Sequence, residues 1–256
     1  MRSLALLLPV LFAFTGVIFA DVQMSRKLIK SNTDGIRFDA DSNDTVDVII
    51  TASGNLGIGT LTPSANLHVE GNVYFLGNLN LADGINYRGS GKPKRSIILT
   101  AAGAIPPGNS NGCEQALEDG SFHSYYTLSF DDSTDEYAYW HWIQPDSYDG
   151  GNINATLYWY AGAGAGDAVW TLDTKGIADG EAIDAALGTV QSVTETTGAA
   201  NIMNVTAFTA FSPGWVAGDY IIFKLARDAD AVADDMVGDG KVIKIKIEYS
   251  VNTETD

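Results

Sequence analysis

Cysteine and histidine are scarce in this sequence. Cys113 is its only cysteine, so no disulfide can form within one chain and the fold depends on burial and strand pairing. We expect a buried, inert thiol at Cys113, the alternative being a bridge between two chains. The histidines are His68, His123 and His141. None is spaced i, i+4 from another, which removes the usual ligand pair of a transition-metal site.

Positive charge is also scarce. The 256 residues include 15 Lys and Arg against 32 Asp and Glu, a formal net charge of −17. Proteins that bind nucleic acid neutralise its phosphates with clustered Lys and Arg, so we expect no nucleic-acid partner. Signatures of enzymes are missing too, since there is no Gly-x-Ser-x-Gly elbow and the glycines of residues 54–59 are in the wrong order for a dinucleotide loop. We expect no enzyme and no catalytic residues.

The only long apolar run lies at the N-terminus. Arg2 precedes an apolar stretch over residues 4–14, and Ala20 stands before the polar Asp21. This pattern predicts a secretory signal peptide over residues 1–20. The alternative is an uncleaved anchor, because ~20 apolar residues can span a bilayer. No second span follows, so we expect an extracellular or cell-surface protein with no stable membrane span once the signal is removed.

Two short regions follow the signal peptide. Residues 21–52 form an N-terminal extension with one β-like stretch, Val46–Ile50. Residues 53–86 contain short alternating runs punctuated by Gly and Asn, which predicts a stalk of short strands. Strands this short gain a core from identical neighbours. The Val46–Ile50 strand is a candidate for completing the sheet of a neighbouring subunit.

Residues 87–95, with the sequence YRGSGKPKR, are basic and rich in Gly. This composition predicts a hinge-like linker. A basic patch for anionic surfaces is the alternative.

Residues 96–256 show alternation of apolar and polar side chains, the mark of half-buried strands. In the last run, Ile243, Ile245 and Ile247 are expected on the core face with Tyr249 and Val251, and Lys244 and its alternate neighbours on the wet face. One short helical turn is expected near Glu181–Leu187. The fold class predicted is all-β, a two-sheet, jelly-roll-like β-sandwich after a β-stalk. The expected strands are Ile97–Leu99, His123–Phe130, Tyr137–Ile143, Ile153–Tyr160, Ala168–Leu172, Thr189–Val193, Met203–Phe208, Tyr220–Ala226 and Val242–Val251.

The stalk segment carries a family resemblance. Residues 54–72, GNLGIGTLTPSANLHVEGN, resemble the Gly-Ile-Gly-Thr segment of phage tail fibres and of bacterial surface fibres of similar build. The resemblance implies a fibrous, usually trimeric stalk.

A set of short segments in the C-terminal region carries a second resemblance, which extends over residues 96–250. The segments are residues 129–136 (SFDDSTDE), Pro145, 148–151 (YDGG), 155–159 (ATLYW), 169–170 (VW), 217–219 (AGD) and 224–228 (KLARD). They resemble a domain type found in phage tail and structural proteins of unassigned role. The resemblance implies a β-sandwich head carried on a fibre or particle, and it brings no known active-site residues with it.

Grouped carboxylates are the candidate metal ligands. Acidic residues spaced along one loop can converge on Ca²⁺, and a glycosidase would need two carboxyls about 5 to 10 Å apart across a sugar. A solvated turn in which Asp caps backbone amides is the alternative. We therefore expect at most Ca²⁺ as a cofactor, at Asp131, Asp132, Asp135 and Glu136 or at Asp39, Asp41 and Asn43.

Aromatic residues and sequons complete the candidate sites. Alternation places most Trp side chains in the core, whereas Tyr137, Tyr139, Tyr158 and Tyr160 fall on the other strand faces, available to a ligand or a neighbouring subunit. Asn-x-Ser/Thr sequons predict glycosylation, at Asn43, Asn154 and Asn204.

These patterns favour a self-assembling subunit of an extracellular fibre or surface appendage, in which the chain's partner is itself as a homopolymer or homotrimer. The alternative is a receptor- or glycan-binding head on a trimeric stalk, of tail-fibre type and located on a virion. A surface glycan is the second expected partner. A hydrolase finds little support in the residues.

Overall fold

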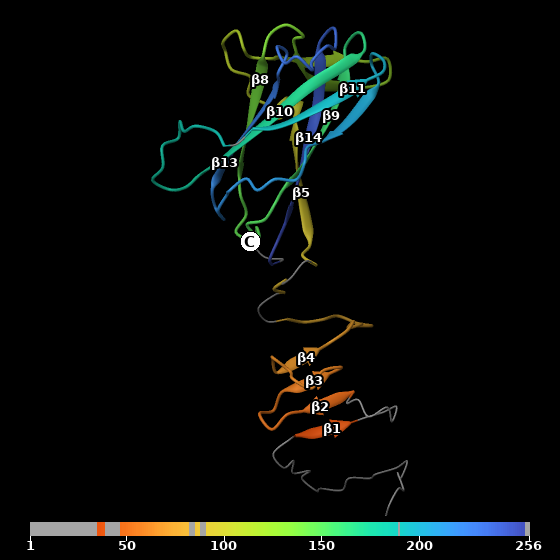
Figure 1. The fold of residues 1–256 in the computed structure, drawn as a ribbon, viewed down its shortest axis with the longest axis vertical. Helices are drawn as coiled ribbons and strands as arrows, with labels where there is room; N and C mark the ends of the chain where they lie inside the picture. The colour runs from red at the N-terminus through yellow and green to blue at the C-terminus, as the bar shows by residue number, and fades with distance from the viewer. Residues whose placement is uncertain (1–34, 39–46, 82–84, 88–90, 189, 254–256) are drawn as a thin grey trace, which may run out of the picture. The chain divides into compact units, whose positions relative to one another are not determined.

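The chain divides into two compact units, residues 1–79 and 80–256. The computed structural model describes residues 35–38, 47–81, 85–87, 91–188 and 190–253 (Figure 1). Regular structure in these residues is β throughout, apart from one 3-10 turn, η1, at Ala101–Gly103, so the predicted all-β class is confirmed. Within the same ranges, no helix has the length and hydropathy needed to cross a membrane.

The first unit contains one small sheet in the order β1-β2-β3-β4. The pairs β1–β2 and β2–β3 are antiparallel, and β3–β4 is parallel. Because β2 is hydrogen-bonded on both edges, it has no free edge for a neighbour, and the prediction that the Val46–Ile50 strand adds to another subunit's sheet is wrong. The strands are β1 (Ile36–Phe38), β2 (Val48–Ile50), β3 (Leu56–Ile58) and β4 (Leu67–Val69).

A glycine ends β3 and lets the chain return for a parallel strand. Gly59 has φ of +71°, and a Cβ there would lie 2.8 Å from the carbonyl oxygen of Glu70. Both constraints exclude larger residues. The Gly-Ile-Gly-Thr segment therefore has a local structural reason for its second glycine.

The second unit is a sandwich of two sheets, as predicted (Figure 1). One sheet has the antiparallel order β11-β10-β13-β8; its strands are β8 (Glu136–Ile143), β10 (Gly166–Ile177), β11 (Gln191–Thr197) and β13 (Tyr220–Arg227). The other has the order β12-β9-β14-β7-β6, with β5 paired to the second half of β14; its strands are β5 (Lys94–Thr100), β6 (Glu114–Asp119), β7 (Ser124–Phe130), β9 (Asn154–Ala161), β12 (Met203–Ala207) and β14 (Gly240–Ser250).

Three local expectations differ from the structure. The strand β6 was not expected, because its sequence EQALED lacks the β-branched and aromatic residues typical of strands. Residues 181–187 form bends and no helix. The predicted 87–95 linker ends early, since β5 begins at Lys94, which pairs with Ser250, and the Val251 N–H donates to the Pro93 carbonyl at 3.0 Å.

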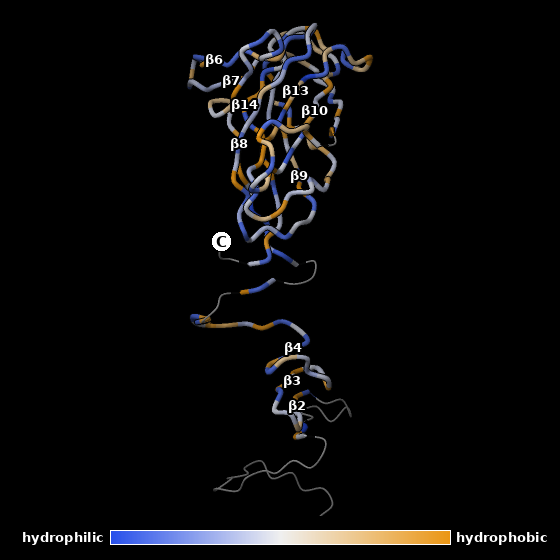
Figure 2. The backbone as a smooth tube through the Cα atoms, turned by 90° about the vertical axis from the view of Figure 1, so that its left-hand side faces the viewer, coloured by the Kyte–Doolittle hydropathy of each residue, from blue (hydrophilic) through white to orange (hydrophobic). Residues whose placement is uncertain are grey.

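The core lies between the two sheets and is built around aromatic rings. Figure 2 shows hydrophobic and hydrophilic residues alternating along the strands of the sandwich. Trp170 contacts Trp159 and Phe130 at centroid distances of 5.1 and 5.3 Å, both edge to face, a favourable arrangement for aromatic quadrupoles. A Cβ on Gly240 would lie 2.8 Å from the Trp170 ring, so the start of β14 requires glycine. The core position expected for most Trp residues is confirmed.

A β-bulge interrupts β14. The pairing register with β9 shifts between Val242 and Lys244, and Val242 and Ile245 are both fully buried although they are three residues apart. An inserted residue turns the strand in this way. Ile243 therefore leaves the core face on which strict alternation placed it, and lies next to Lys244 on the outer side of the sheet.

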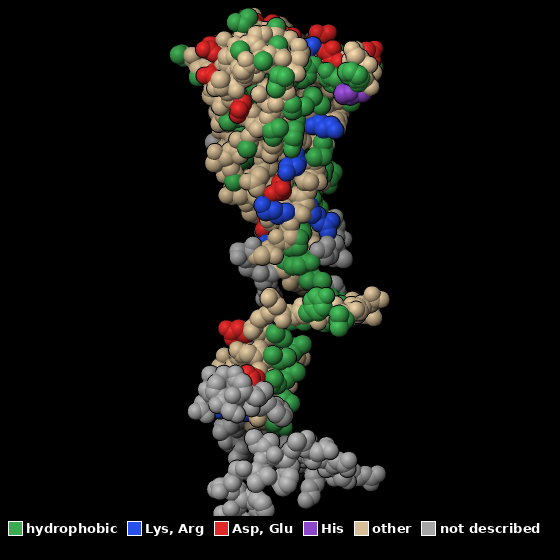
Figure 3. Space-filling model, turned by 90° about the vertical axis from the view of Figure 1, so that its right-hand side faces the viewer, with side chains coloured by type: hydrophobic (Ala, Val, Ile, Leu, Met, Phe, Trp, Pro, Cys, Tyr) green, Lys and Arg blue, Asp and Glu red, His purple; other side chains and the backbone are tan. Residues whose placement is uncertain are grey.

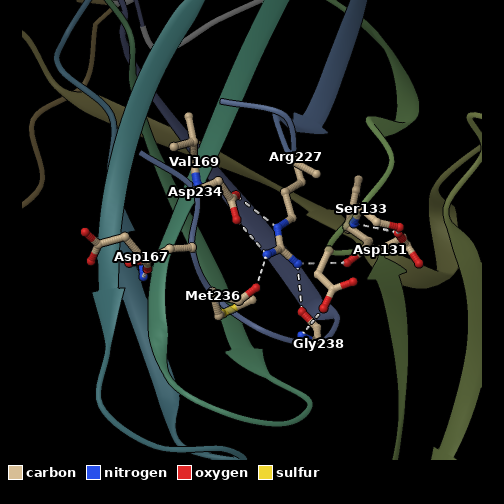
Figure 4. Close-up of polar contacts among 12 residues, drawn as sticks. Asp131, Ser133, Asp167, Val169, Arg227, Asp234, Met236 and Gly238 are labelled. Atoms are coloured by element: carbon tan, nitrogen blue, oxygen red, sulfur yellow. Dashed lines mark hydrogen bonds and ion pairs between the residues drawn. The ribbon is translucent and has the colours of Figure 1, made fainter. Parts of the chain in front are cut away.

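One fully buried ion pair fixes the end of the sandwich where β13 ends. Arg227 is 0% exposed, and its Nε and Nη2 donate to the two carboxylate oxygens of Asp234 at 3.0 and 2.7 Å (Figure 4). Its remaining donors reach the carbonyl oxygens of Gly238 at 2.8 Å, Met236 at 2.6 Å and Phe130 at 3.4 Å. Every direction of the guanidinium is thus satisfied by an acceptor, as a buried charge requires.

We predict that Arg227→Met lowers the free energy of unfolding by about 3–5 kcal/mol, because it leaves the Asp234 carboxylate buried without its partner. Urea denaturation of a chain of residues 21–256, called the mature chain from here on, measures the change. Lys175→Met is the matched control, since Lys175 is partly exposed and lies 3.9 Å from Glu181, and it should change the value by less than about 0.5 kcal/mol. A loss below about 1 kcal/mol for Arg227→Met would contradict the role given to this pair.

Candidate functional site

The acids predicted as Ca²⁺ ligands mostly bind backbone amides. Asp131 Oδ1 accepts from the Ser133 N–H at 2.7 Å (Figure 4), and Glu136 Oε2 accepts from the Asp131 N–H at 2.8 Å. Asp132 accepts from the Gly238 N–H, and Asp135 accepts from the Ala229 N–H at 2.8 Å. This is the amide-capping arrangement given as the alternative, and the four carboxylates do not converge on one point. Asp39, Asp41 and Asn43 lie outside the described residues.

Asp131 and Glu136 line a small acidic cavity of about 190 Å³. Glu114 and Asp239 complete its acidic lining. Burial and the nearby Asp131 carboxylate raise the pKa of Glu136, while hydrogen bonds from Ser133 lower that of Asp131. Opposed shifts of this kind can support acid–base chemistry. The cavity is nevertheless smaller than the ~300 Å³ at which ligand pockets begin, so it gives no room for a sugar between the two carboxyls.

Asp135 also belongs to a carboxylate cluster with Asp228 and Asp230, whose oxygens lie within 4.8 Å of one another. Burial, followed by the neighbouring carboxylates of Asp230 and Asp135, raises the pKa of Asp228. Carboxylates grouped this way suit a hard cation. Calcium binding stays a prediction, and sequence analysis missed Asp228 and Asp230 because they are ~90 residues from Asp135 in the chain yet adjacent in the fold.

The four candidate tyrosines separate onto opposite sides of the sandwich. Tyr137 and Tyr139 lie on the outer face of β8, with ring centroids 5.5 Å apart. Tyr158 and Tyr160 lie on the outer face of β9, in the other sheet, where Tyr158 is half-buried but Tyr160 is only 7% exposed and so is less available than predicted. The alternation that predicted outward side chains could not show that two different surfaces result.

The outer face of β8 and β13 has cavities lined by acidic residues, and the Lys224 side chain covers the Tyr137 ring on it. Its cavities of about 480 and 290 Å³ are lined in part by Asp135, Asp173, Asp228 and Asp184. Lys224 Nζ lies 4.5 Å from the centroid of the Tyr137 ring. Burial raises the pKa of Asp173, with the Lys224 charge opposing that change. This face is therefore negatively charged, and its Lys224 ammonium already makes a cation–π contact with Tyr137.

The outer face of β9 and β14 is different and forms a groove. Two cavities of about 450 and 360 Å³ adjoin there and share Met203, Ile243 and Lys244. Figure 3 shows a face of the sandwich on which hydrophobic side chains gather beside Lys and Arg. The lining residues, called the β9–β14 groove from here on, are Ile98, His123, Tyr125, Tyr158, Tyr160, Asn201, Met203, Ile243 and Lys244.

The strand pairing explains why these residues meet. Lys244 is opposite Tyr158 on β9, and Tyr158 is opposite Val205 on β12. At the bulge, the partner of β14 on its other edge changes from β7 to β5. Because of this change, a groove forms between the start of β7 and the middle of β5, and Ile243 lines both of its cavities.

Aromatic rings form one end of the groove. The ring centroids of His123 and Tyr125 are 5.2 Å apart, and those of Tyr125 and Tyr160 are 6.4 Å apart in an edge-to-face arrangement. Burial and a hydrogen bond with the Tyr125 hydroxyl raise the pKa of Tyr160. The two tyrosine rings are therefore in edge-to-face contact at this end of the groove.

Two polar groups in the groove are unpaired. Neither the Asn201 amide nor the Lys244 ammonium has a hydrogen bond or ion pair with a described residue. Asn201 also has φ of 58°, and no other non-glycine residue in the described part of the chain has a positive φ. Left-handed backbone at such a residue is found preferentially at functional sites.

Of the nine groove residues, only Tyr158 and Tyr160 were predicted as site residues, and seven were not: Ile98, His123, Tyr125, Asn201, Met203, Ile243 and Lys244. His123 and Tyr125 were expected only as residues of the strand His123–Phe130. Their meeting with Asn201 depends on strand neighbours, which alternation alone does not determine.

The predicted glycosylation sites have defined surroundings where the structure describes them. Asn154 is the first residue of β9 and pairs with Glu248. Asn204 Nδ2 donates to Thr197 Oγ1 and to the Ile202 carbonyl, both at 3.3 Å, so a glycan on this nitrogen would disturb both bonds. Asn43 lies outside the described residues, and modification at the three sites stays a prediction.

The single thiol is buried, as expected. Cys113 is 3% exposed. Burial, with a contribution from the Glu136 carboxylate, raises its pKa to about 12. A thiol that is both buried and protonated reacts poorly, which disfavours the alternative of a bridge between two chains.

Neither a protein-family model nor a curated protein matches this sequence. Among solved structures, the chain is similar to a CBM36-1 domain of a multidomain xylanase from the hindgut metagenome of Trinervitermes trinervoides, at 11% identity and a TM-score of 0.36, covering 60% of this chain and 96% of that one. The chain is also similar to a CBM35 from Cellvibrio japonicus Abf62, at 13% identity and a TM-score of 0.36, covering 62% of this chain and 99% of that one. A third similar structure is the C-terminal CBM6 of LamC from Zobellia galactanivorans, at 12% identity and a TM-score of 0.32, covering 60% of this chain and 98% of that one. Likenesses this distant carry no argument about what this chain binds.

Proposed function

We propose that the sandwich unit is a non-catalytic carbohydrate-binding head that uses the β9–β14 groove. The observation that carries the proposal is the groove's lining, in which three tyrosines and aliphatic side chains accompany unpaired polar groups on a solvent-facing side of a sheet. A sugar ring has an apolar C–H face and a hydroxyl rim. Tyrosine complements both, because its ring is apolar and its hydroxyl can form hydrogen bonds.

The size and rigidity of the groove support this assignment. The adjoining cavities, about 450 and 360 Å³, are within the range of ligand sites, ~300–1,000 Å³. Most residues of the groove lie on the hydrogen-bonded strands β5, β7, β9, β12 and β14, and the rings of Tyr125 and Tyr160 contact each other edge to face. Preorganised side chains of this kind reduce the entropy lost on binding.

The proposal that the head is non-catalytic is based on the groove's charge. Hydrolysis of a glycosidic bond usually requires two carboxyl groups that flank it. Among the described residues that line the groove, none is Asp or Glu. The acids that line the cavity near Glu136 belong to a different and smaller space.

We predict that Tyr158→Ala weakens glycan binding on the order of 10- to 100-fold, the usual effect of removing a central aromatic contact. Tyr158 is half-buried on the outer face, so the sandwich should remain folded, as near-UV circular dichroism would show. Binding is first located on a glycan array with the mature chain and then measured by calorimetry. The matched control is Tyr139→Ala, a half-buried tyrosine on the outer face of the other sheet.

Equal losses in the two variants, or a loss confined to Tyr139→Ala, would place the site elsewhere. Absence of binding to every glycan on the array would reject the proposed function.

We propose as a second function that the first unit joins copies of this chain to one another. One face of its sheet carries apolar residues in two rows, Ile36-Ile50-Leu56-Leu67 and Val48-Ile58-Val69. Ile50, Ile58 and Leu67 are 38%, 40% and 58% exposed, and Ile49 is the only buried hydrophobic residue in the described part of this unit.

An apolar face of this extent, without a core of its own, is stabilised when it is removed from water. Identical copies present identical faces, and symmetric association is the commonest way to bury them. This supports the expected self-assembly by face-to-face packing, in place of strand addition through β2.

We predict that Ile58→Asp with Leu67→Asp converts an oligomer into a monomer, because it places two carboxylates on the apolar face. Size-exclusion chromatography with light scattering on the mature chain gives the masses. Val232→Asp is the control, since Val232 is fully exposed in the sandwich unit and should not change the mass. A native chain that is monomeric at micromolar concentration would reject self-association.

A further inference from the structure

We infer that the ligand of the β9–β14 groove is a carboxylated glycan, one that contains hexuronic or sialic acid, and that Lys244 binds its carboxylate. This inference rests on the proposed function and specifies the class of sugar. It follows from the charge of the groove, the pairing of its neighbours and the bulge.

The groove has a charge opposite to that of the whole chain. The sequence has 32 acidic and 15 basic residues, and cavities elsewhere on the sandwich are lined by acids such as Asp135, Asp184 and Glu136. The two cavities of the groove have no acid among their lining residues and contain Lys244, unlike the three acidic cavities just named. Local positive potential in an acidic chain favours an anionic ligand in this place.

The lysines around Lys244 have carboxylate partners, with Lys94 and Lys246 sharing Glu248, whereas Lys244 has none among the described residues. Lys241 forms an ion pair with Glu118 at 2.5 Å, and Lys94 and Lys246 lie 2.9 and 3.5 Å from Glu248. The Lys244 side chain is exposed and has no ion pair with a described residue. Its charge remains available to a ligand, for which a carboxylate is the matching group.

The bulge accounts for the apolar residue beside Lys244, because it brings Ile243 to the same side of the sheet. Without the inserted residue, Ile243 and Lys244 would point to opposite sides of the sheet. With it, both lie on the outer side, where they line the same cavities. Bulges frequently re-aim a side chain in this way at functional sites.

The register also places Lys244 beside a stacking surface. Tyr158 is its direct partner on β9, and directly opposed residues have Cβ atoms about 4.5–5.5 Å apart. A sugar ring lying on Tyr158 would bring a ring carboxylate within reach of the Lys244 ammonium. The unpaired Asn201 amide then offers hydrogen bonds to hydroxyls farther along the groove.

The test compares carboxylated oligosaccharides with neutral counterparts that have the same sugar backbone. The probes are oligogalacturonates and their methyl esters, oligoglucuronates and their methyl esters, and sialyl-oligosaccharides with and without the sialic acid. We expect the mature chain to prefer a carboxylated member at least about tenfold, which corresponds to about 1.4 kcal/mol. The preference should fall as salt rises from 50 to 500 mM, because screening weakens exposed charge pairs.

Lys244→Met tests the assigned residue and should reduce the affinity for the carboxylated probe to that of its neutral counterpart. Lys175→Met, on the other sheet, should leave both affinities unchanged. If Lys244→Met still binds the carboxylated probe more tightly than the neutral one, by the same factor as the native chain, the role of Lys244 would be overturned.

Equal binding of carboxylated and neutral probes by the native chain would overturn the inference while leaving the carbohydrate-binding head intact. Absence of binding to either class would reject the proposed function as well.

Discussion

The buried Arg227–Asp234 pair is the interaction on which the order of the sandwich depends. A guanidinium that is 0% exposed must find an acceptor for each donor, because an unpaired buried charge costs several kcal/mol. Its acceptors lie at the end of β7, on Phe130, and in the loop before β14, on Asp234, Met236 and Gly238. One side chain at the end of β13 therefore holds both of these segments in place.

The start of β14 follows from that constraint. Gly238 accepts from Arg227, and Gly240 packs against the Trp170 ring two residues later. From this position, one edge of β14 pairs with β9 along its length. The other edge pairs first with β7 and then with β5. The bulge lies where the neighbour of β14 changes from β7 to β5. The residues on the outer face at the bulge therefore depend on where Arg227 fixes the start of β14.

Much of the fold is predictable from the sequence, because alternation with period two is a direct consequence of strand geometry. It located the strand regions from β7 to β14 and put Trp159 and Trp170 inside. It failed for β6, whose polar sequence becomes a strand only by pairing with β7. It also failed for Ile243, because an inserted residue leaves no mark in the alternation itself.

Less of the candidate site is predictable. Tyr158 and Tyr160 were expected outside the core from their own strand, and they line the groove. Asn201 and His123 join them only because β12 and β7 lie on either side of β9 and β14. For the acids of the 131–136 turn, the sequence left both Ca²⁺ binding and amide capping open, and in the structure Asp131 and Glu136 accept from nearby N–H groups. Local hydrogen bonds compete with any distant ligand, and sequence spacing does not show which interaction prevails.

A crystal structure of the mature chain with a carboxylated oligosaccharide would test the account most directly. The account predicts a sugar ring against Tyr158, with its carboxylate within hydrogen-bond distance of Lys244 Nζ, in the β9–β14 groove. A sugar bound instead on the outer face of β8 and β13, or beside the carboxylates of Asp135 and Asp228, would contradict it.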